Sequence, residues 1–93
     1  MNSLYLNNND DLYRYLVALA GELRERGKCG ASSQVTLASQ FAFGSASEFL
    51  DQAMVALSSV QAECKDVLTP AQLADVESIS AQIKTAFQRI GGA

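Results

Sequence analysis

The chain has 93 residues and a mass of 9.9 kDa, enough for one domain with a single core. Hydrophobic residues make up 48% of it and charged residues 18%, which is typical of a packed globular chain and not of a disordered one. There is no His, and there are only two Cys. This inventory excludes imidazole acid–base catalysis and His-based triads, and two Cys are too few for a structural zinc site.

The net charge of −3 is unevenly distributed along the chain. Residues 1–43 are balanced, whereas residues 44–93 carry six acidic side chains against Lys65, Lys84 and Arg89. A protein that binds nucleic acid presents a basic face, so we expect no nucleic-acid partner. The motifs GxxxxGK[ST] and GxGxxG are both absent from the sequence. We therefore expect no enzymatic activity, no cofactor and no metal, and we identify no catalytic, cofactor-binding or metal-ligating residue.

The N-terminal sequence gives no sign of export. MNSLYLNNNDD lacks the basic start and the apolar run of a signal peptide. The longest strongly apolar stretch, Leu16 to Ala20, is far shorter than the ~20 residues that span a bilayer. Two cysteines in a chain without export signals are typical of a reducing compartment. We expect a cytoplasmic protein with no membrane partner.

The first expected helix covers residues 9–27. Asn7, Asn8 and Asn9 supply an N-cap residue, and Asp10 and Asp11, which follow, favour the positive end of the helix dipole. Gly27 is a candidate left-handed C-cap. Leucines form a central stripe, with more apolar residues on both flanks: Leu12, Leu16, Leu19 and Leu23, then Tyr13, Val17 and Ala20 on one side and Tyr15 on the other. The apolar arc of about 200° is wider than one bundle interior requires, and this width indicates assembly.

Two further helices are expected over residues 32–43 and 46–68. Ser32 or Ser33 caps the first, which ends near Phe43. Ser45 and Glu48 form a capping box that opens the second. The apolar residues of the second fall within an arc of roughly 140°: Phe49, Leu50, Ala53, Met54, Leu57, Val60, Cys64, Val67 and Leu68.

A fourth helix is expected over residues 70–90. Thr69 and Gln72 form another capping box with Pro70 at the first helical position, and Gly91-Gly92 stop the helix. Its apolar seam has the spacing of a coiled coil: Leu73, Val76, Ser80, Ile83, Phe87 and Ile90. The sequence thus predicts one all-α domain over residues 1–93. We expect a four-helix bundle with one short helix, centred on the antiparallel hairpin of residues 46–68 and 70–90.

Three groups of charged or reactive residues have both a functional and a structural interpretation. Cys29 and Cys64 can be interpreted as a redox pair or, structurally, as a loop thiol and a core thiol. A basic cluster is an anion site, or it complements the helix dipole with one i,i+4 ion pair. Four carboxylates are an acid–base or metal pair, or they form a solvated helix face. We favour the structural interpretation in all three cases. The basic cluster consists of Arg24, Arg26 and Lys28, and the four carboxylates are Glu48, Asp51, Glu63 and Asp66.

Several apolar residues have no place in a monomer core. Phe41 and Phe43 are about 200° apart on one helix, so they cannot both face the same interior. Val55 stands among polar residues, and residues 70–90 carry a second stripe of small side chains. We expect these positions, with the flank of the first helix, to form a homodimer interface. The candidate interface residues are Tyr13, Val17, Phe43, Val55, Ala74 and Ala81.

Three short stretches carry a resemblance to other proteins. Asp11–Leu16 (DLYRYL), Ser45–Ala53 (SASEFLDQA) and Ala86–Ala93 (AFQRIGGA) resemble small uncharacterised bacterial helical proteins of about this length. Such proteins are found on genomic islands and integron-type gene cassettes. The resemblance implies a bacterial, intracellular accessory gene product, and it implies no activity, cofactor or catalytic residue.

The sequence as a whole predicts a non-enzymatic helical protein-interaction module that acts as a homodimer. One alternative is an antitoxin- or chaperone-like regulator that covers a basic or apolar client protein. A second alternative is a small-molecule binder with an apolar pocket lined by Phe41, Phe43, Phe49 and tyrosines. An exposed apolar groove would favour the client, and an enclosed aromatic cavity would favour the small molecule.

Overall fold

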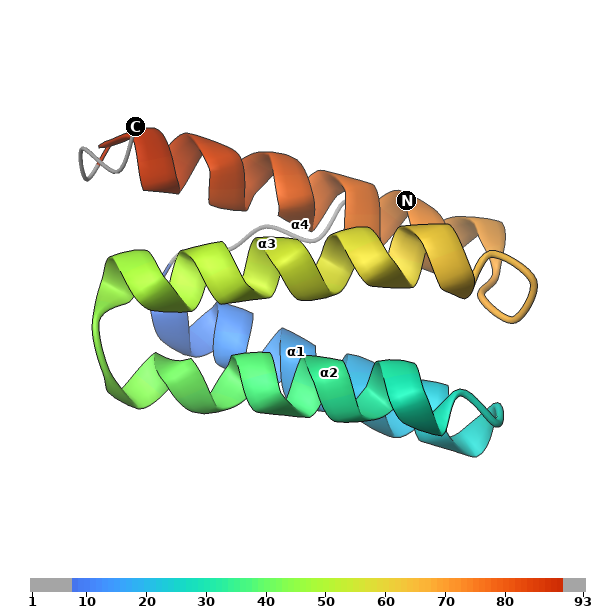
Figure 1. The fold of residues 1–93 in the computed structure, drawn as a ribbon. Helices are drawn as coiled ribbons and strands as arrows, with labels where there is room; N and C mark the ends of the chain where they lie inside the picture. The colour runs from blue at the N-terminus through green and yellow to red at the C-terminus, as the bar shows by residue number, and fades with distance from the viewer. Residues whose placement is uncertain (1–7, 90–93) are drawn as a thin grey trace.

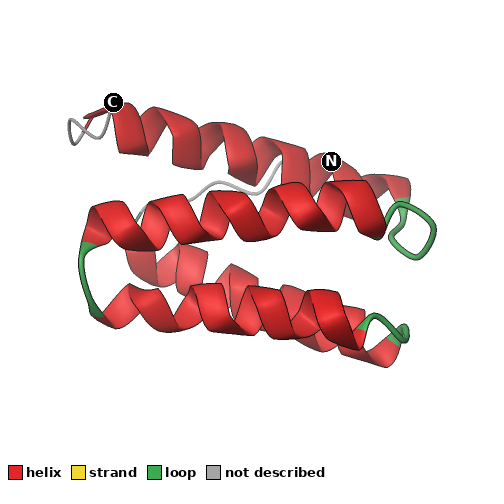
Figure 2. Ribbon diagram, viewed as in Figure 1, coloured by secondary structure: helices red, strands yellow, loops and turns green. Residues whose placement is uncertain are grey.

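The computed structural model describes residues 8–89, and four α-helices make up most of this part of the chain (Figure 1). The predicted helix end at Ile90 and the Gly91-Gly92 stop lie outside the described residues. No strand occurs between residues 8 and 89 (Figure 2), and the all-α prediction is confirmed. The elements are α1 (Asn9–Glu25), α2 (Cys29–Gln40), a 3-10 turn η1 (Phe41–Phe43), α3 (Ala46–Glu63) and α4 (Pro70–Arg89).

The helices form an up-and-down bundle in which each helix packs against the next one in the chain. In Figure 1, α2 and α3 lie in front, with α1 and α4 behind them. The α1–α2 and α3–α4 connections lie at one end of the bundle, and the α2–α3 connection lies at the other. The predicted α3–α4 hairpin is present. A second hairpin, formed by α1 and α2, packs at least as closely.

Three of the predicted helix-end signals are formed as expected. The Asn8 side chain accepts a hydrogen bond from the Asp11 amide at 2.9 Å and caps α1. Gly27 has φ of 83°, the left-handed conformation that glycine adopts without a Cβ clash. At α4, the Gln72 amide donates to the Thr69 hydroxyl at 3.1 Å, and the Thr69 amide donates to the Gln72 side-chain oxygen at 3.0 Å. This second capping box is therefore confirmed.

The prediction that Ser32 or Ser33 caps the second helix is wrong. α2 begins at Cys29, and its N-cap residue Lys28 makes no side-chain capping bond. Ser32 lies inside α2, buried, and its hydroxyl donates to the Ala20 carbonyl oxygen of α1 at 2.7 Å. Because α2 begins three residues before Ser32, the Ser32 hydroxyl lies inside the helix and bonds across to α1 instead of capping.

The capping box predicted at the start of α3 is also not formed. Ser45 is the N-cap residue, as expected, but its side chain makes no hydrogen bond to the helix. Its hydroxyl instead shares a hydrogen bond with the Ser47 hydroxyl at 3.0 Å. The Ser45 hydroxyl therefore bonds to a side chain two residues along the chain and not to the Glu48 amide.

The first three helices end earlier than predicted. α1 ends at Glu25, and residues 41–43 tighten into η1 after α2. α3 ends at Glu63, and the amides of Val67 and Leu68 both donate to the Cys64 carbonyl oxygen at 3.1 Å in the turn that follows. Leu68 is buried although it lies beyond the helix. The apolar spacing of α3 therefore continues beyond the helix itself, and for this reason it predicted a helix end five residues too late.

All four helices contribute to one hydrophobic core. On α4, Val76, Ile79 and Ile83 are buried, while Ser80 and Phe87 of the predicted seam are only partly buried. The buried face of α4 therefore includes Ile79, which the coiled-coil spacing had left out. The other buried apolar residues are Leu12, Leu16, Leu19, Ala20, Leu23, Ala31, Val35, Ala38, Phe49, Leu50, Ala53, Ala56, Leu57, Val60, Cys64 and Leu68.

The difference between formed and unformed caps gives a test of the fold. Asn8→Ala and Thr69→Ala should each lower the free energy of unfolding by about 1 kcal/mol, because each removes a side-chain bond to a helix amide. Ser45→Ala is the matched control and should change it by only a few tenths of a kcal/mol, since Ser45 makes no such bond. Urea denaturation measures all three, and equal losses would contradict the cap assignments.

Candidate functional site

The wide apolar face of α1 is divided between three surroundings. Its central leucines are buried in the core. One flank lies against α2 and η1, where Ala20 accepts the Ser32 bond and Tyr13 meets Phe43. The other flank, with Tyr15, lies toward α4. Much of the 200° arc is therefore used within one chain, and Val17 is the part of it that remains 48% exposed.

Two aromatic rings from distant parts of the chain, Tyr13 of α1 and Phe43 of η1, are in contact. The rings of Tyr13 and Phe43 are 5.4 Å apart between centroids, with an interplanar angle of 66°, an edge-to-face contact. Tyr13 is partly buried, whereas Phe43 is 80% exposed. Val17 follows Tyr13 by four residues and so lies on the same side of α1. We call Tyr13, Val17 and Phe43 the α1–η1 apolar surface.

The remaining predicted interface residues are exposed but lie on other elements. Val55, on α3, is 57% exposed, and Ala74 and Ala81 are exposed on the side of α4 opposite its buried residues. The structure thus brings two of the six predicted residues, Tyr13 and Phe43, into contact, and Val17 lies one turn from Tyr13 on α1. Leu37, on α2, is 59% exposed and was missed by the sequence analysis. Leu37 lies about 200° from Val35 around the helix, and this spacing could have predicted that the two side chains face opposite sides.

Two residues of the basic cluster near the end of α1, Arg26 and Lys28, hold the two connections together. Arg26 donates to the Val67 carbonyl oxygen at 2.9 Å and to the Gln72 side chain, and it pairs with Glu22 at 2.8 Å. Lys28 pairs with Asp66 at 3.4 Å. These bonds tie the α1–α2 connection to the α3–α4 turn. They also confirm the i,i+4 pair between Glu22 and Arg26.

The flank of α1 that faces α4 is polar at its edge. Gln72 donates to Glu22 at 3.4 Å, next to the Arg26 contacts. Burial raises the pKa of the Tyr15 hydroxyl above its ordinary range, and the negative charge of Asp75 raises it further. Tyr15 therefore stays protonated at neutral pH, as a partly buried ring between two helices.

The two cysteines are free and lie in different environments. Cys29 is exposed at the start of α2, and Cys64 is fully buried at the end of α3. Burial raises the pKa of the Cys64 thiol; nearby Lys28 opposes this rise, and Glu63 and Asp66 add to it. The interpretation of Cys64 as a core thiol is confirmed, whereas Cys29, expected in a loop, is the first residue of α2.

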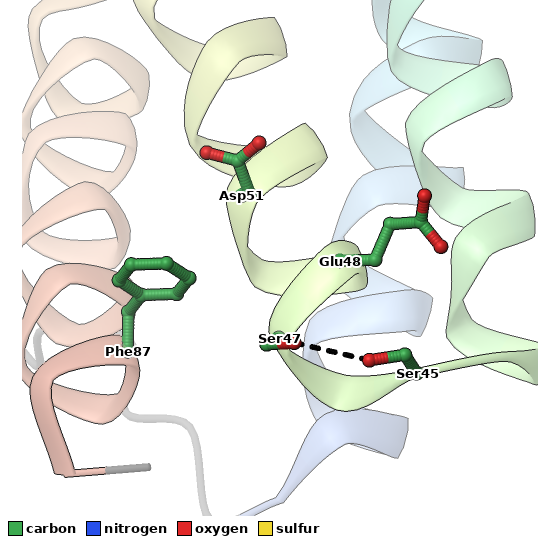
Figure 3. Close-up of a pocket in the computed structure, with 5 residues that line it drawn as sticks. All are labelled: Ser45, Ser47, Glu48, Asp51 and Phe87. Carbon is green, nitrogen blue, oxygen red and sulfur yellow. Dashed lines mark hydrogen bonds between the residues drawn. The ribbon is translucent and has the colours of Figure 1, made fainter. Parts of the chain in front are cut away.

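The four candidate carboxylates lie on the exposed side of α3 and its following turn. Two of them line an open depression of about 580 Å³ at the start of α3, together with Ser45, Ser47 and Phe87. Figure 3 shows the Glu48 and Asp51 side chains pointing in different directions. Within residues 8–89, no group of three His, Cys, Asp or Glu side chains is placed to hold a metal ion. The depression is open to solvent, and Phe87 is the aromatic residue in its lining; Phe49 is instead fully buried in the core.

Comparison of the chain with models of known protein families, with curated proteins and with solved structures finds no match. In the part of the chain from residue 8 to residue 89, no helix is long and apolar enough to cross a membrane. The geometry of the described residues therefore carries the functional argument.

Arg26, which caps the end of α1, should contribute more to the free energy of unfolding than Arg14, which lies within α1. Arg26→Gln should lower the free energy of unfolding by about 1–2 kcal/mol, because it leaves the Val67 carbonyl and the Gln72 oxygen without a charged donor. Arg14→Gln is the control, since its pair with Asp10 is highly exposed, and it should cost a few tenths of a kcal/mol at most. Chemical denaturation compares them, and a loss at Arg14 as large as that at Arg26 would contradict the assignment.

The two thiols should react at very different rates. In the native protein a thiol reagent should modify Cys29 within the mixing time of a bench assay and leave Cys64 unmodified, since Cys64 is buried and its raised pKa lowers its thiolate fraction. Denaturant should expose Cys64. The Cys29→Ser variant isolates the buried thiol, and rapid native labelling of that variant would refute the prediction.

Proposed function

We propose that the protein is a non-enzymatic helical interaction module that forms a homodimer through the α1–η1 apolar surface. The observation that carries the proposal is the exposure of Phe43, which is 80% exposed although its ring contacts Tyr13. Large aromatic side chains are typical anchors of protein interfaces, because they bury much area at a small cost in conformational entropy.

Clustering distinguishes this surface from the other exposed apolar residues. Leu37 and Val55 lie singly on α2 and α3, and scattered apolar residues are ordinary on a soluble protein. Phe43 of η1 contacts Tyr13 of α1, and Val17 follows Tyr13 by one turn on the same side of α1, so these residues come from two elements. Burial of such a cluster against another chain would stabilise the complex by ~25 cal/mol for each Å² of apolar area removed from water.

A regulator that covers a client protein is the second candidate. The hollow lined by Glu48 and Asp51 favours a basic client, because carboxylates would pair with its cations. The small-molecule alternative has less support, since Phe49 lies in the core and cannot line a pocket.

We further propose a cytoplasmic location and a bacterial origin for the chain as an accessory gene product. The exposed free thiol of Cys29 and the unpaired Cys64 suit a reducing compartment. The resemblance to proteins of genomic islands and integron-type cassettes supports the origin.

Light scattering tests the dimer directly. The wild-type chain should have a mass of about 20 kDa, twice its own 9.9 kDa, at micromolar concentration. Val17→Glu and Phe43→Glu should each shift the mass toward 10 kDa, because a charge would be buried without a partner at the interface.

Val55→Glu is the matched control for these variants. Val55 is also an exposed valine on a helix, but it lies outside the α1–η1 apolar surface, so this change should leave the dimer intact. A wild-type protein that remains monomeric at high micromolar concentration would overturn the proposal, as would equal effects of Val17→Glu and Val55→Glu.

A further inference from the structure

Three exposed residues of α1 lie on one line at equal intervals. Asp10, Val17 and Arg24 are each seven residues apart, which is nearly two full turns, so they share one side of the helix. The acid lies at the start of the line, the base lies at its end, and the valine lies midway. Reversal of the helix direction therefore places acid against base at both ends and valine against valine at the centre.

Arg24, the last of these three residues, carries a positive charge that no acidic side chain among the described residues neutralises. Within residues 8–89, the Arg24 side chain has neither an ion pair nor a hydrogen bond. Asp10 pairs with Arg14 at 3.0 Å, but both side chains remain largely exposed, so the Asp10 carboxylate can accept another cation. The end of α1 thus offers a cation and its start offers an anion on the same side.

Gly21 leaves a gap among the exposed side chains of α1. It lies inside α1, where glycine is less favourable than alanine, and it is exposed. A Cβ built at Gly21 would meet nothing within 4 Å, so packing within the chain does not require glycine there. Gly21 follows Val17 by four residues, and Tyr13 precedes Val17 by four. When two α1 helices lie antiparallel with their Val17 residues opposite each other, Tyr13 of one helix is at the level of Gly21 of the other.

We propose that a second copy of this chain docks with its α1 antiparallel to the first, on a two-fold axis at Val17. A two-fold interface requires a surface that complements itself, and this line does so in charge and in shape. Asp10 of each copy pairs with Arg24 of the other, and Tyr13 packs over Gly21 of the other. A parallel arrangement would instead set Asp10 against Asp10 and Arg24 against Arg24.

This inference rests on the proposed homodimer and adds its geometry, which cysteine cross-linking can test. All variants carry Cys29→Ser to remove the exposed thiol, and Cys64 is buried. An equimolar mixture of Asp10→Cys and Arg24→Cys chains, oxidised with copper–phenanthroline, should give a disulfide-linked dimer. Neither chain alone should give one. Val17→Cys alone should cross-link to itself, and Val55→Cys should not.

A second measurement separates the interface from helix stability. Gly21→Leu replaces glycine with a good helix former, so it should raise the thermal stability of the monomer. It should also raise the dissociation constant of the dimer by about tenfold or more, because the new side chain fills the space taken by Tyr13 of the other copy. A dimer that is unchanged or tightened by this substitution would overturn the inference.

The outcomes also separate the inference from the proposed function. If the wild-type chain is monomeric in light scattering, both fail. If it is a dimer but the Asp10→Cys and Arg24→Cys mixture does not cross-link, the antiparallel α1 pairing is wrong while the homodimer stands. Self-cross-linking of Asp10→Cys or of Arg24→Cys alone would indicate the parallel arrangement and likewise overturn the inference.

Discussion

Burial of the leucine stripe of α1 is the interaction on which the rest of the structure depends. Leu12, Leu16, Leu19 and Leu23 are each at most 6% exposed, and they belong to a single core to which all four helices contribute. Burying a leucine is worth about 1.5–3 kcal/mol relative to leaving it in water. The two hairpins, α1–α2 and α3–α4, are local in sequence, and this shared core joins them into one domain.

The position of the stripe also fixes what the two flanks of α1 can do. With the leucines facing inward, Tyr15, Glu22 and Arg26 are carried toward α4, where they meet polar side chains and the α3–α4 turn. Tyr13 and Val17 are carried to the opposite flank, beside η1. One flank thus closes the bundle with directed hydrogen bonds. The other flank keeps an apolar surface that remains exposed among the described residues 8–89.

The candidate surface was only partly predictable for a geometric reason. The width of the apolar arc identified Tyr13 and Val17 as surplus to a core, and the spacing of Phe41 and Phe43 identified one surplus ring. Their meeting depends on the η1 turn, which brings Phe43 back against α1 across thirty residues of sequence. Val55, Ala74 and Ala81 had the same kind of signal, but the fold places them on other elements, so a shared apolar character did not imply a shared surface.

The sequence by itself determined the helical class, the number of helices and the ends whose signals act within one turn. Asn8, Gly27 and the Thr69–Gln72 box need only their immediate neighbours, so local patterns were sufficient to place them. Only the tertiary structure decided the partners of Ser32 and Arg26, because their hydrogen bonds go to α1 and to the α3–α4 turn. A polar side chain takes its best-placed partner, and which partner is best placed depends on which helix lies alongside it.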